Sequence, residues 1–514
     1  MSIAETGPTK DEALVPLGPA QKLLATAVIM LATIIVVIDQ TIAVVVMPHM
    51  QAALGATPDT ISWVLTTYIL AGAVGTPLTG WLTGRFGRTA FFAVAILGFT
   101  ISSMVCAMAV SLPMMVAARF IQGFFGAFIT PLGQTFLYDM NKPSKQVQAI
   151  TIWGAGIIVA PIMGPVLGGY LAETFNWRWV FFINLPIGLL AGAGVLLAMP
   201  KFPAIRRSFD HVGFLLIAIA ICAVQLALDR GTQQDWLESP EIIIELALSA
   251  AFFWMLVFHL RSAKHPLLPI ALFRNRNFNA AMLLSFIVMP LLLASSAMMP
   301  QLLQLLMGYP AQLAGTVMMP RAGAMLVGMF LGGWMMKRID TRVQLLIGVL
   351  LIAWSMHLQT GFNLQMGSEL VVWAGMIQGV GLGVSMTVVN FLAIASAPTE
   401  LRTEAAAVYT LVRNTGTSIV IAISTALLAH NIQVSHSDLG SAIQGLDLPM
   451  ALADGRAGAQ IAAMADAEIN RQAMMIAYID DFWLMMWACI LTIPLLLLVR
   501  PVRPARGETV AMAE

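Results

Sequence analysis

Charged residues are scarce in this chain. Asp, Glu, Lys and Arg together make up 10% of its 514 residues, whereas an ordinary soluble domain carries about 25%. Because a soluble fold needs a charged surface in proportion to its area, this composition argues against a soluble enzyme and against a disordered scaffold. The net charge of +1 creates no field that would attract nucleic acid, so we expect no nucleic-acid partner.

Motifs for metals and nucleotides are also missing. Cys106, Cys222 and Cys489 lie in separate apolar runs without metal-ligand spacing, and the seven His form no HExxH pattern. There is no GxxxxGK[ST] loop, which argues against direct drive by ATP. The acidic doublet Asp480-Asp481 lies at the start of the last apolar run, where an N-cap is the ordinary interpretation. We therefore expect no metal, no cofactor and no enzyme activity.

Long apolar runs are what the sequence has in abundance. Hydrophobic residues make up 59% of the chain, and the mean hydropathy is +0.84. A helix needs about 20 mostly apolar residues to span a bilayer, and fourteen runs meet this need, from residues 23–48 to residues 481–499. The runs are continuous rather than alternating, so they predict helices and not barrel strands. The predicted fold class is an all-α polytopic membrane protein with fourteen transmembrane helices in the lipid bilayer.

Lys and Arg give these spans an orientation. With fourteen spans, 20 of the 27 basic residues fall on one side of the membrane, four fall on the other side and three lie within spans. Basic residues gather on the cytoplasmic side of membrane proteins. We therefore expect a multi-pass protein of the inner membrane with both termini in the cytoplasm.

Two short stretches recur at nearly the same distance along the chain. GWLTGR at residues 80–85 returns as GWMMKR at 333–338, an offset of 253, and Gln122-Gly123 returns as Gln378-Gly379, an offset of 256. Such offsets indicate two related six-span bundles, a plan that transporters use with the substrate site between the halves.

The repeat divides the chain into a tail, a bundle, an insertion, a second bundle and a second tail. The second bundle carries a polar outer loop, residues 431–480, with a helical stretch near 457–477. The two inserted spans are expected to form additional central helices. In the order tail, bundle, insertion, bundle and tail, the predicted boundaries are 1–21, 22–200, 201–265, 266–500 and 501–514.

Four charged residues lie deep within the predicted spans: Asp39, Arg119, Arg321 and Arg413. A charge at the bilayer centre costs about 2.5–3.5 kcal/mol, so such residues are expected to pair or to serve function. Asp39, late in the first span, and Arg119, early in the fourth, fall at similar depth, so the two can pair. A fixed ion pair between helices and a proton-coupling site both fit this placement. Arg119 has Gly375 as its repeat counterpart and Asp39 has no clear acidic one, so charge-driven chemistry is concentrated in the first half.

Other polar residues within the spans are candidates for a substrate cavity. Arg321 and Arg413 each fit a structural role, a water-filled cavity or contact with an anionic substrate. Polar amides within spans either line a cavity or join helices by hydrogen bonds. The candidates for the cavity of a small-molecule substrate are Gln122, Arg321, Gln378, Asn390, Arg413 and Asn414.

Glycine and proline point to two conformational elements. In the fifth span, Gly164-Pro165 and Gly168-Gly169 combine close helix packing with a break in the backbone ladder, which suits a pivot or a seal between the halves. The tight turn after the second span, residues 80–89, is a basic loop that contains Gly80 and Gly87, and Gly87 suits a positive φ. Arg85 and Arg88 in this loop can bond the carbonyl ends of neighbouring helices and so close the cytoplasmic side.

Residues 39–48, residues 80–88, Arg119 with Gln122-Gly123, and Gly164 to Gly169 each form a distinct motif. Together they resemble the major facilitator superfamily, and specifically its fourteen-span drug:proton antiporters of the EmrB/QacA type. The runs at 176–188, 228–236 and 470–473 look typical of the same subfamily, so the resemblance covers nearly the whole chain. Three departures concern gating: Gly84 replaces a usual Asp, Val44 replaces a frequent Asn, and the second loop copy at 339–342 lacks a Gly.

The resemblance implies roles for these residues. Asp39 and Arg119 would belong to proton coupling, and the fifth-span motif would mark an exporter. The EmrB type works with a periplasmic adaptor and an outer-membrane channel, for which residues 431–480 are a candidate docking surface. We therefore expect a proton-coupled antiporter that exports lipophilic or amphipathic small molecules by alternating access. The alternatives are an importer or exporter of a specific metabolite or siderophore, and a polytopic membrane enzyme.

Overall fold

The computed structural model describes residues 17–200, 208–444 and 456–500, and within these residues it contains helices and no strand. The predicted tails therefore lie largely outside the described residues, as does part of the predicted outer loop. The first half comprises α1 (Pro19–Val45), α2 (Met47–Leu54), α3 (Pro58–Ile61), α4 (Trp63–Gly75), α5 (Thr79–Phe86), α6 (Arg88–Ala107), α7 (Leu112–Asp139), α8 (Pro143–Thr174), α9 (Trp179–Phe182) and α10 (Asn184–Ala198).

The insertion and the second half follow the same helical plan. The inserted pair is α11 (His211–Arg230) and α12 (Pro240–Ser262). The second half comprises α13 (Ile270–Phe273), α14 (Arg276–Gln301), α15 (Ala311–Met335), α16 (Thr341–Gln359), α17 (Ser368–Ala395), α18 (Arg402–Gln444) and α19 (Arg456–Leu491), after which a short 3-10 segment covers Ile493–Leu498.

The span count agrees with a polytopic membrane protein. Twelve helices of the described chain are long and apolar enough to cross a membrane, and the bent helix α8 brings the number to thirteen. The remaining predicted span, residues 60–82, is divided between α4 and α5 by a 3-10 turn at Thr76–Leu78, where Pro77 removes a backbone donor. Fourteen spans are compatible with this arrangement.

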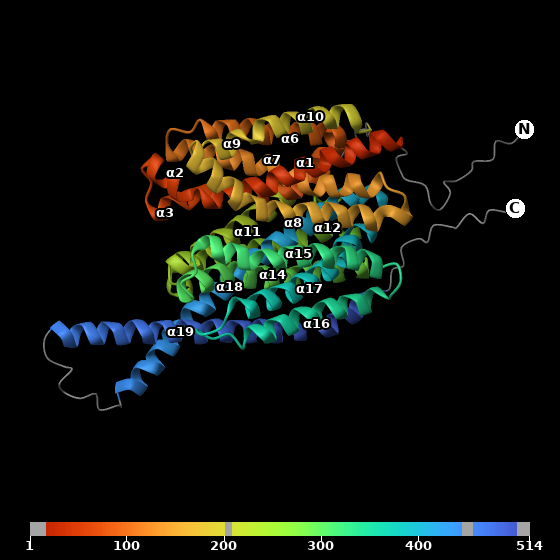
Figure 1. The fold of residues 1–514 in the computed structure, drawn as a ribbon. Coiled ribbons are helices and arrows are strands. Elements are labelled where there is room, and N and C mark those ends of the chain that lie inside the picture. The colour runs from red at the N-terminus through yellow and green to blue at the C-terminus, as the bar shows by residue number, and fades with distance from the viewer. Residues whose placement is uncertain (1–16, 201–207, 445–455, 501–514) are drawn as a thin grey trace, which may run out of the picture.

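The helices lie side by side in two halves, with the inserted pair attached to both (Figure 1). The inserted helix α11 packs against α12, against α4 of the first half and against α18 of the second half. The start of α1 and the end of the described chain lie at the same end of the assembly in Figure 1. We call this end the terminal face; it also holds the starts of α6, α16 and α18 and the ends of α7 and α10.

Short polar residues set where several helices begin. Ser111 accepts a hydrogen bond from the backbone amide of Met114 at the start of α7, and Asp340 accepts one from Arg342 at the start of α16. These side chains satisfy backbone donors that a helix start leaves unpaired. Asp210 does the same for α11 and also accepts from the backbone amide of Leu267 and from His259. The cap on α11 therefore also ties down the connection into the second half.

The predicted outer loop is largely helical in the structure. α18 continues to Gln444, beyond the predicted span end at residue 430, and α19 begins at Arg456, before the predicted start at 481. Figure 1 shows both helices extending past the rest of the assembly, away from the terminal face. The segment 456–479 is rich in Ala and contains one Gly and no Pro, so its high helix propensity continues the last span outward. For the same reason the N-cap interpretation of Asp480-Asp481 is wrong: both residues lie inside α19, and Asp481 is buried.

The repeat is visible in how the helices pack. A Cβ atom on Gly123 of α7 would lie 2.2 Å from the backbone oxygen of Tyr68 in α4, and one on Gly379 of α17 would lie 2.3 Å from the backbone oxygen of Arg321 in α15. Equivalent glycines therefore let equivalent pairs of helix backbones touch in both halves. Gly123 and Gly379 are 256 residues apart, and Tyr68 and Arg321 are 253 residues apart, which are the two offsets found in the sequence.

This packing predicts matched losses of stability. Gly123→Ala and Gly379→Ala should each cost about 1–3 kcal/mol, because the added methyl group meets rigid backbone. Thermal unfolding of the purified protein in detergent measures the effect. Gly169→Ala is the control, because a Cβ atom there has nothing within 4 Å. Equal unfolding temperatures for the three variants would contradict this account of the helix contacts.

Candidate functional site

Asp39 lies at the centre of a closed polar network in the first half. Its Oδ2 accepts from the Arg119 guanidinium at 2.6 Å, and its Oδ1 accepts from Gln122 Nε2 at 2.9 Å and from Asn184 Nδ2 at 2.7 Å. The Asp39 and Arg119 side chains are both 0% exposed. Helices α1, α7 and α10 thus meet at one carboxylate, and the ion pair that the sequence suggested is present.

A second ring of contacts holds Arg119 in place. Its Nε donates to the backbone oxygen of Val64 at 3.4 Å, and its NH1 donates to Gln122 Oε1 at 2.8 Å. The guanidinium also lies over the Tyr68 ring, 4.3 Å from its centroid, and 5.7 Å from that of Phe181. A desolvated cation is stabilised by such ring faces and by charge-assisted hydrogen bonds. Arg119 is therefore oriented toward Asp39 by α4, by α9 and by Gln122 of its own helix.

Sequence reasoning did not assign a role to Asn184. This amide is 1% exposed and joins Asp39 to Ser103 Oγ at 2.8 Å, which in turn donates to the Phe181 backbone oxygen at 3.0 Å. A polar Asn inside an apolar run was the only available signal. Its contact with Asp39 spans 145 residues, so no local spacing reveals it.

The network has a clear chemical consequence. The Asp39 carboxylate accepts three hydrogen bonds, one of them from a cation, so both of its oxygens are engaged within the protein. In this conformation its side chain has no exposed surface. Proton exchange at Asp39 therefore requires a second conformation in which α1, α7 or α10 shifts.

The fifth-span motif packs directly on this part of α1. A Cβ atom on Gly164 would lie 2.0 Å from Thr41 Oγ1, and one on Gly168 would lie 3.3 Å from Ile42 Cγ1. Helix α8 bends by 41° between Pro161 and residue 166. The side chain of Pro165 lies outside the described part, and a Cβ atom on Gly169 would have no neighbour within 4 Å. The motif thus packs a bent helix against Thr41 of α1, two positions along the chain from Asp39.

A second charged cluster joins the two halves at the terminal face. Asp139, at the end of α7, accepts from Arg88 at 2.8 Å and from Arg402, at the start of α18, also at 2.8 Å. We call Arg88, Asp139 and Arg402 the terminal latch. Sequence reasoning identified Arg88 but missed Asp139 and Arg402, because their contact joins residues 263 positions apart.

The glycines of the loop motif shape this latch. Gly87 has φ +82° and connects α5 to α6, and Gly80 lies so close to Glu404 that a Cβ atom would be 2.3 Å from its Cγ. The Arg85 side chain is exposed in the last turn of α5, where its charge complements the helix end. The halves also share an apolar cluster at the terminal face, made of Tyr138, Val147, Ile150, Met336, Phe391 and Ile394. The two halves are therefore closed against each other at this face.

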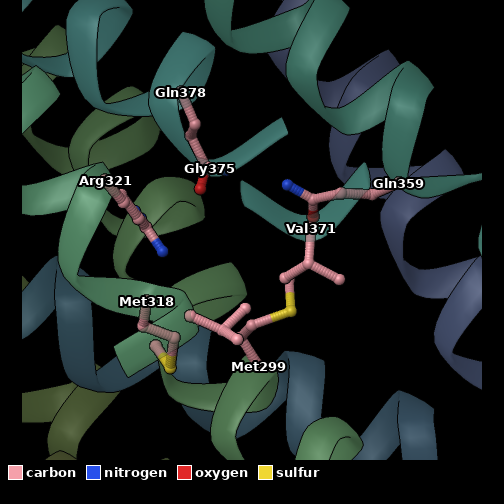
Figure 2. A pocket seen from close by; sticks show the side chains of 8 residues that line it. Met299, Met318, Arg321, Gln359, Val371, Gly375 and Gln378 are labelled. Atoms are coloured by element: carbon pink, nitrogen blue, oxygen red, sulfur yellow. The ribbon is translucent and has the colours of Figure 1, made fainter. Parts of the chain in front are cut away.

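The substrate-cavity candidates fall into three places. Gln122 belongs to the Asp39 network. Asn390 is buried and accepts from the Tyr409 hydroxyl at 2.6 Å, and Arg413 lies near Tyr409 and beside the exposed Asn414 on α18. Arg321 and Gln378 line a cavity that has a volume of about 10 Å³ and lies inside the second half (Figure 2).

Two helical halves related by a repeat, closed at one face and holding a buried ion pair, define a polytopic membrane transport protein. The chain belongs to the major facilitator superfamily, whose family model matches residues 29–421.

Similar proteins agree with this assignment. The chain is 30% identical to the multidrug export protein EmrB of Escherichia coli K12, over 91% of this chain and 93% of that protein. It is 28% identical to the multidrug resistance protein B homolog of Mycobacterium tuberculosis H37Rv, over 92% and 91%. Among solved structures, a double-Trp variant of XylE superposes with a TM-score of 0.59 at 13% identity, covering 94% of this chain and 97% of that one. The human organic anion transporter MFSD10 gives a TM-score of 0.59 at 11% identity, covering 92% and 100%.

The terminal latch makes a testable prediction. Asp139→Asn replaces the carboxylate that both arginines share, so the closed face should open more often. Spin labels at Phe86→Cys and Val343→Cys, exposed residues of α5 and α16, should show a larger population at long distance in a cysteine-free background.

The matched control for this experiment is Asp340→Asn, which makes the same carboxylate-to-amide change at the same face without touching the latch and leaves an oxygen that can still cap α16. It should leave the label distances as they are. Identical distance distributions for Asp139→Asn and the parent protein would show that the latch does not hold the halves together.

Proposed function

We propose that this protein is a proton-coupled antiporter that exports lipophilic and amphipathic small molecules. The observation that carries the proposal is the Asp39 network: one carboxylate, buried in the bilayer region, is held by Arg119, Gln122 and Asn184 from two other helices. The relatives whose names describe multidrug export support the direction of transport.

Protonation of Asp39 is the step that couples the proton to movement. A neutral carboxyl group no longer attracts the Arg119 guanidinium, so the tie between α1 and α7 weakens. Gly164 and Gly168 of α8 lie against the next turn of α1, so a shift of α1 moves the bent helix as well. One proton moving down about 150 mV supplies about 3.5 kcal/mol, enough for a few-hundred-fold substrate gradient by the factor of ten per 1.4 kcal/mol.

The terminal face is the cytoplasmic face in this proposal. The positive-inside distribution of Lys and Arg supports this orientation, and it places both termini in the cytoplasm and the protein in the inner membrane. With the latch closed, the described conformation is shut toward the cytoplasm. Arg85 and Arg88, with Gly80 and Gly87, then act as gating residues, and release of Asp139 admits substrate from inside.

The helical extension of α18 and α19 is the proposed docking surface for a periplasmic adaptor and, through it, an outer-membrane channel. Residues 431–444 and 456–479 are helical and extend beyond the rest of the assembly (Figure 1). A projecting pair of helices offers side faces to a helical partner. The division into two bundles with two inserted helices, residues 201–265, is the domain plan on which this proposal rests.

The central prediction concerns Asp39→Asn. The variant should bind ethidium but fail to accumulate it in inverted vesicles with an acidic interior, because a side-chain amide does not take up and release a proton near neutral pH. Fluorescence quenching during the imposed gradient measures accumulation, and titration without a gradient measures binding.

Asp481→Asn is the matched control, since Asp481 is another buried acid inside a span but lies outside the network. It should keep proton-driven accumulation. Full accumulation of ethidium by Asp39→Asn would contradict the proposal. Accumulation by the parent protein only in right-side-out vesicles would instead identify an importer.

A further inference from the structure

The second half contains a chain of hydrogen bonds that runs in one direction. Ser355 Oγ donates to the Ala374 backbone oxygen at 2.7 Å, and Gln359 Nε2 donates to Ser355 Oγ at 3.1 Å. Ser295 Oγ donates to Gln359 Oε1 at 3.1 Å, and Gln378 Nε2 donates to Ser295 Oγ at 3.2 Å. Helices α14, α16 and α17 are therefore linked by one relay of buried side chains.

The relay determines which way its amides point. A backbone carbonyl only accepts, so the single proton of Ser355 must go to Ala374, and Gln359 must present its NH₂ group to Ser355. Gln359 then offers its oxygen to Ser295, whose only proton is used there. Gln378 must therefore donate to Ser295 with its nitrogen, which leaves its Oε1 as an acceptor.

This acceptor faces a cavity. Gln378 is 0% exposed, and its Oε1 has no hydrogen-bond partner among the described residues. Figure 2 shows the oxygen end of Gln378 and the nitrogen end of Arg321 directed toward the same space, with Met299, Met318 and Val371 around it. The cavity thus offers a cationic donor and an unmet acceptor within apolar walls.

The first half shows which donor the equivalent glutamine oxygen accepts from. Gln122 donates to Asp39 there as Gln378 donates to Ser295 here, and both pairs are related by the 256-residue offset. In the first half the oxygen of Gln122 accepts from Arg119. The counterpart of Arg119 is Gly375, so in the second half the matching oxygen is left for another donor.

We propose that this cavity is the head-group subsite of the exporter, and that it takes an uncharged group that both donates and accepts a hydrogen bond: a hydroxyl, a phenol or a protonated carboxyl. The O–H donates to Gln378 Oε1, the oxygen accepts from Arg321, and the lipophilic body lies along Met299 and Met318. This inference rests on the proposed function and names the substrate class.

The chemistry of the site sets the selectivity. A dehydrated acceptor penalises any ligand that buries it without supplying a donor, so an ether or an ester is disfavoured relative to the parent alcohol or acid. An anion also lacks a donor for Gln378. The present volume suits a single water molecule, and the unbranched side chains of Met299 and Met318 can move to admit a head group.

The test compares 2-naphthol with 2-methoxynaphthalene, which differ by the O–H donor. Binding to the purified full-length protein in lipid nanodiscs is measured by equilibrium dialysis. The parent protein should bind the naphthol about tenfold more tightly, the ratio that an unmet buried hydrogen-bonding group commonly produces. In Gln378→Met the ratio should fall to about that of partition into protein-free nanodiscs.

Gln344→Met is the matched control. Gln344 is a buried glutamine of the same bundle, its Oε1 also lacks a partner among the described residues, and it lies outside this cavity. It should keep the tenfold ratio. Equal binding of both ligands by the parent protein would mean that the cavity holds only a water molecule and would overturn the proposal, as would an unchanged ratio in Gln378→Met.

Failure of the subsite and failure of the exporter are distinguishable. Proton-driven ethidium accumulation, measured in vesicles, tests export and does not depend on an O–H group in the ligand. Accumulation without a naphthol preference rejects the subsite and leaves the exporter intact. If the protein prefers 2-naphthol but accumulates neither ethidium nor 2-naphthol, the binding site is kept and its role in an exporter is rejected.

Discussion

The cost of holding a charge inside the bilayer constrains the whole structure. Asp39 and Arg119 have no exposed surface, so each charge relies on the other and on Gln122 for the interactions that water would supply, and Asn184 adds a further donor to Asp39. Removing one partner of such a pair leaves an uncompensated buried charge. A movement that separates α1 from α7 would break this pair, and in the proposed mechanism a proton neutralises Asp39 when that happens. This electrostatic requirement is the reason for proposing that proton binding and helix movement are coupled.

The two halves share their packing but not their charges. Gly123 and Gly379 bring equivalent backbones together, and Gln122 and Gln378 contact equivalent positions on the neighbouring helix. At that position the first half has the Asp39 carboxylate and the second half has the Ser295 hydroxyl. A serine can join a hydrogen-bond relay without binding a proton in exchange. The duplicated framework thus provides one half with a buried ion pair, the proposed site of proton coupling, and one half with a cavity that Arg321 and Gln378 line.

Local sequence patterns were sufficient for the features that depend on them. Apolar run length predicted the spans, and the depths of Asp39 and Arg119 predicted that the two residues can meet. Asn184, Asp139 and Arg402 gave no such signal, because their partners lie 145, 51 and 263 residues away and are brought near only by tertiary packing. The start of the last helix, expected at residue 481 and found at Arg456, was misplaced for a different reason. Hydropathy marks where a helix leaves the membrane, whereas helix propensity decides where it ends, and α19 continues well outside its apolar run.

Helix α7 connects the ion pair to the latch. Arg119 lies near its start and Asp139 at its end, which places the two about 30 Å apart along one helix at 1.5 Å per residue. Arg119 is held by α1 and α4, and Asp139 is held by α6 of its own half and by α18 of the other half. Pro131 lies between these two residues inside α7, so a tilt that separates Arg119 from Asp39 also moves Asp139 to the extent that the helix does not bend at this proline. The arginine that pairs with Asp39 and the carboxylate that closes the terminal face are thus both carried on α7, so this one helix connects the ion pair to the latch.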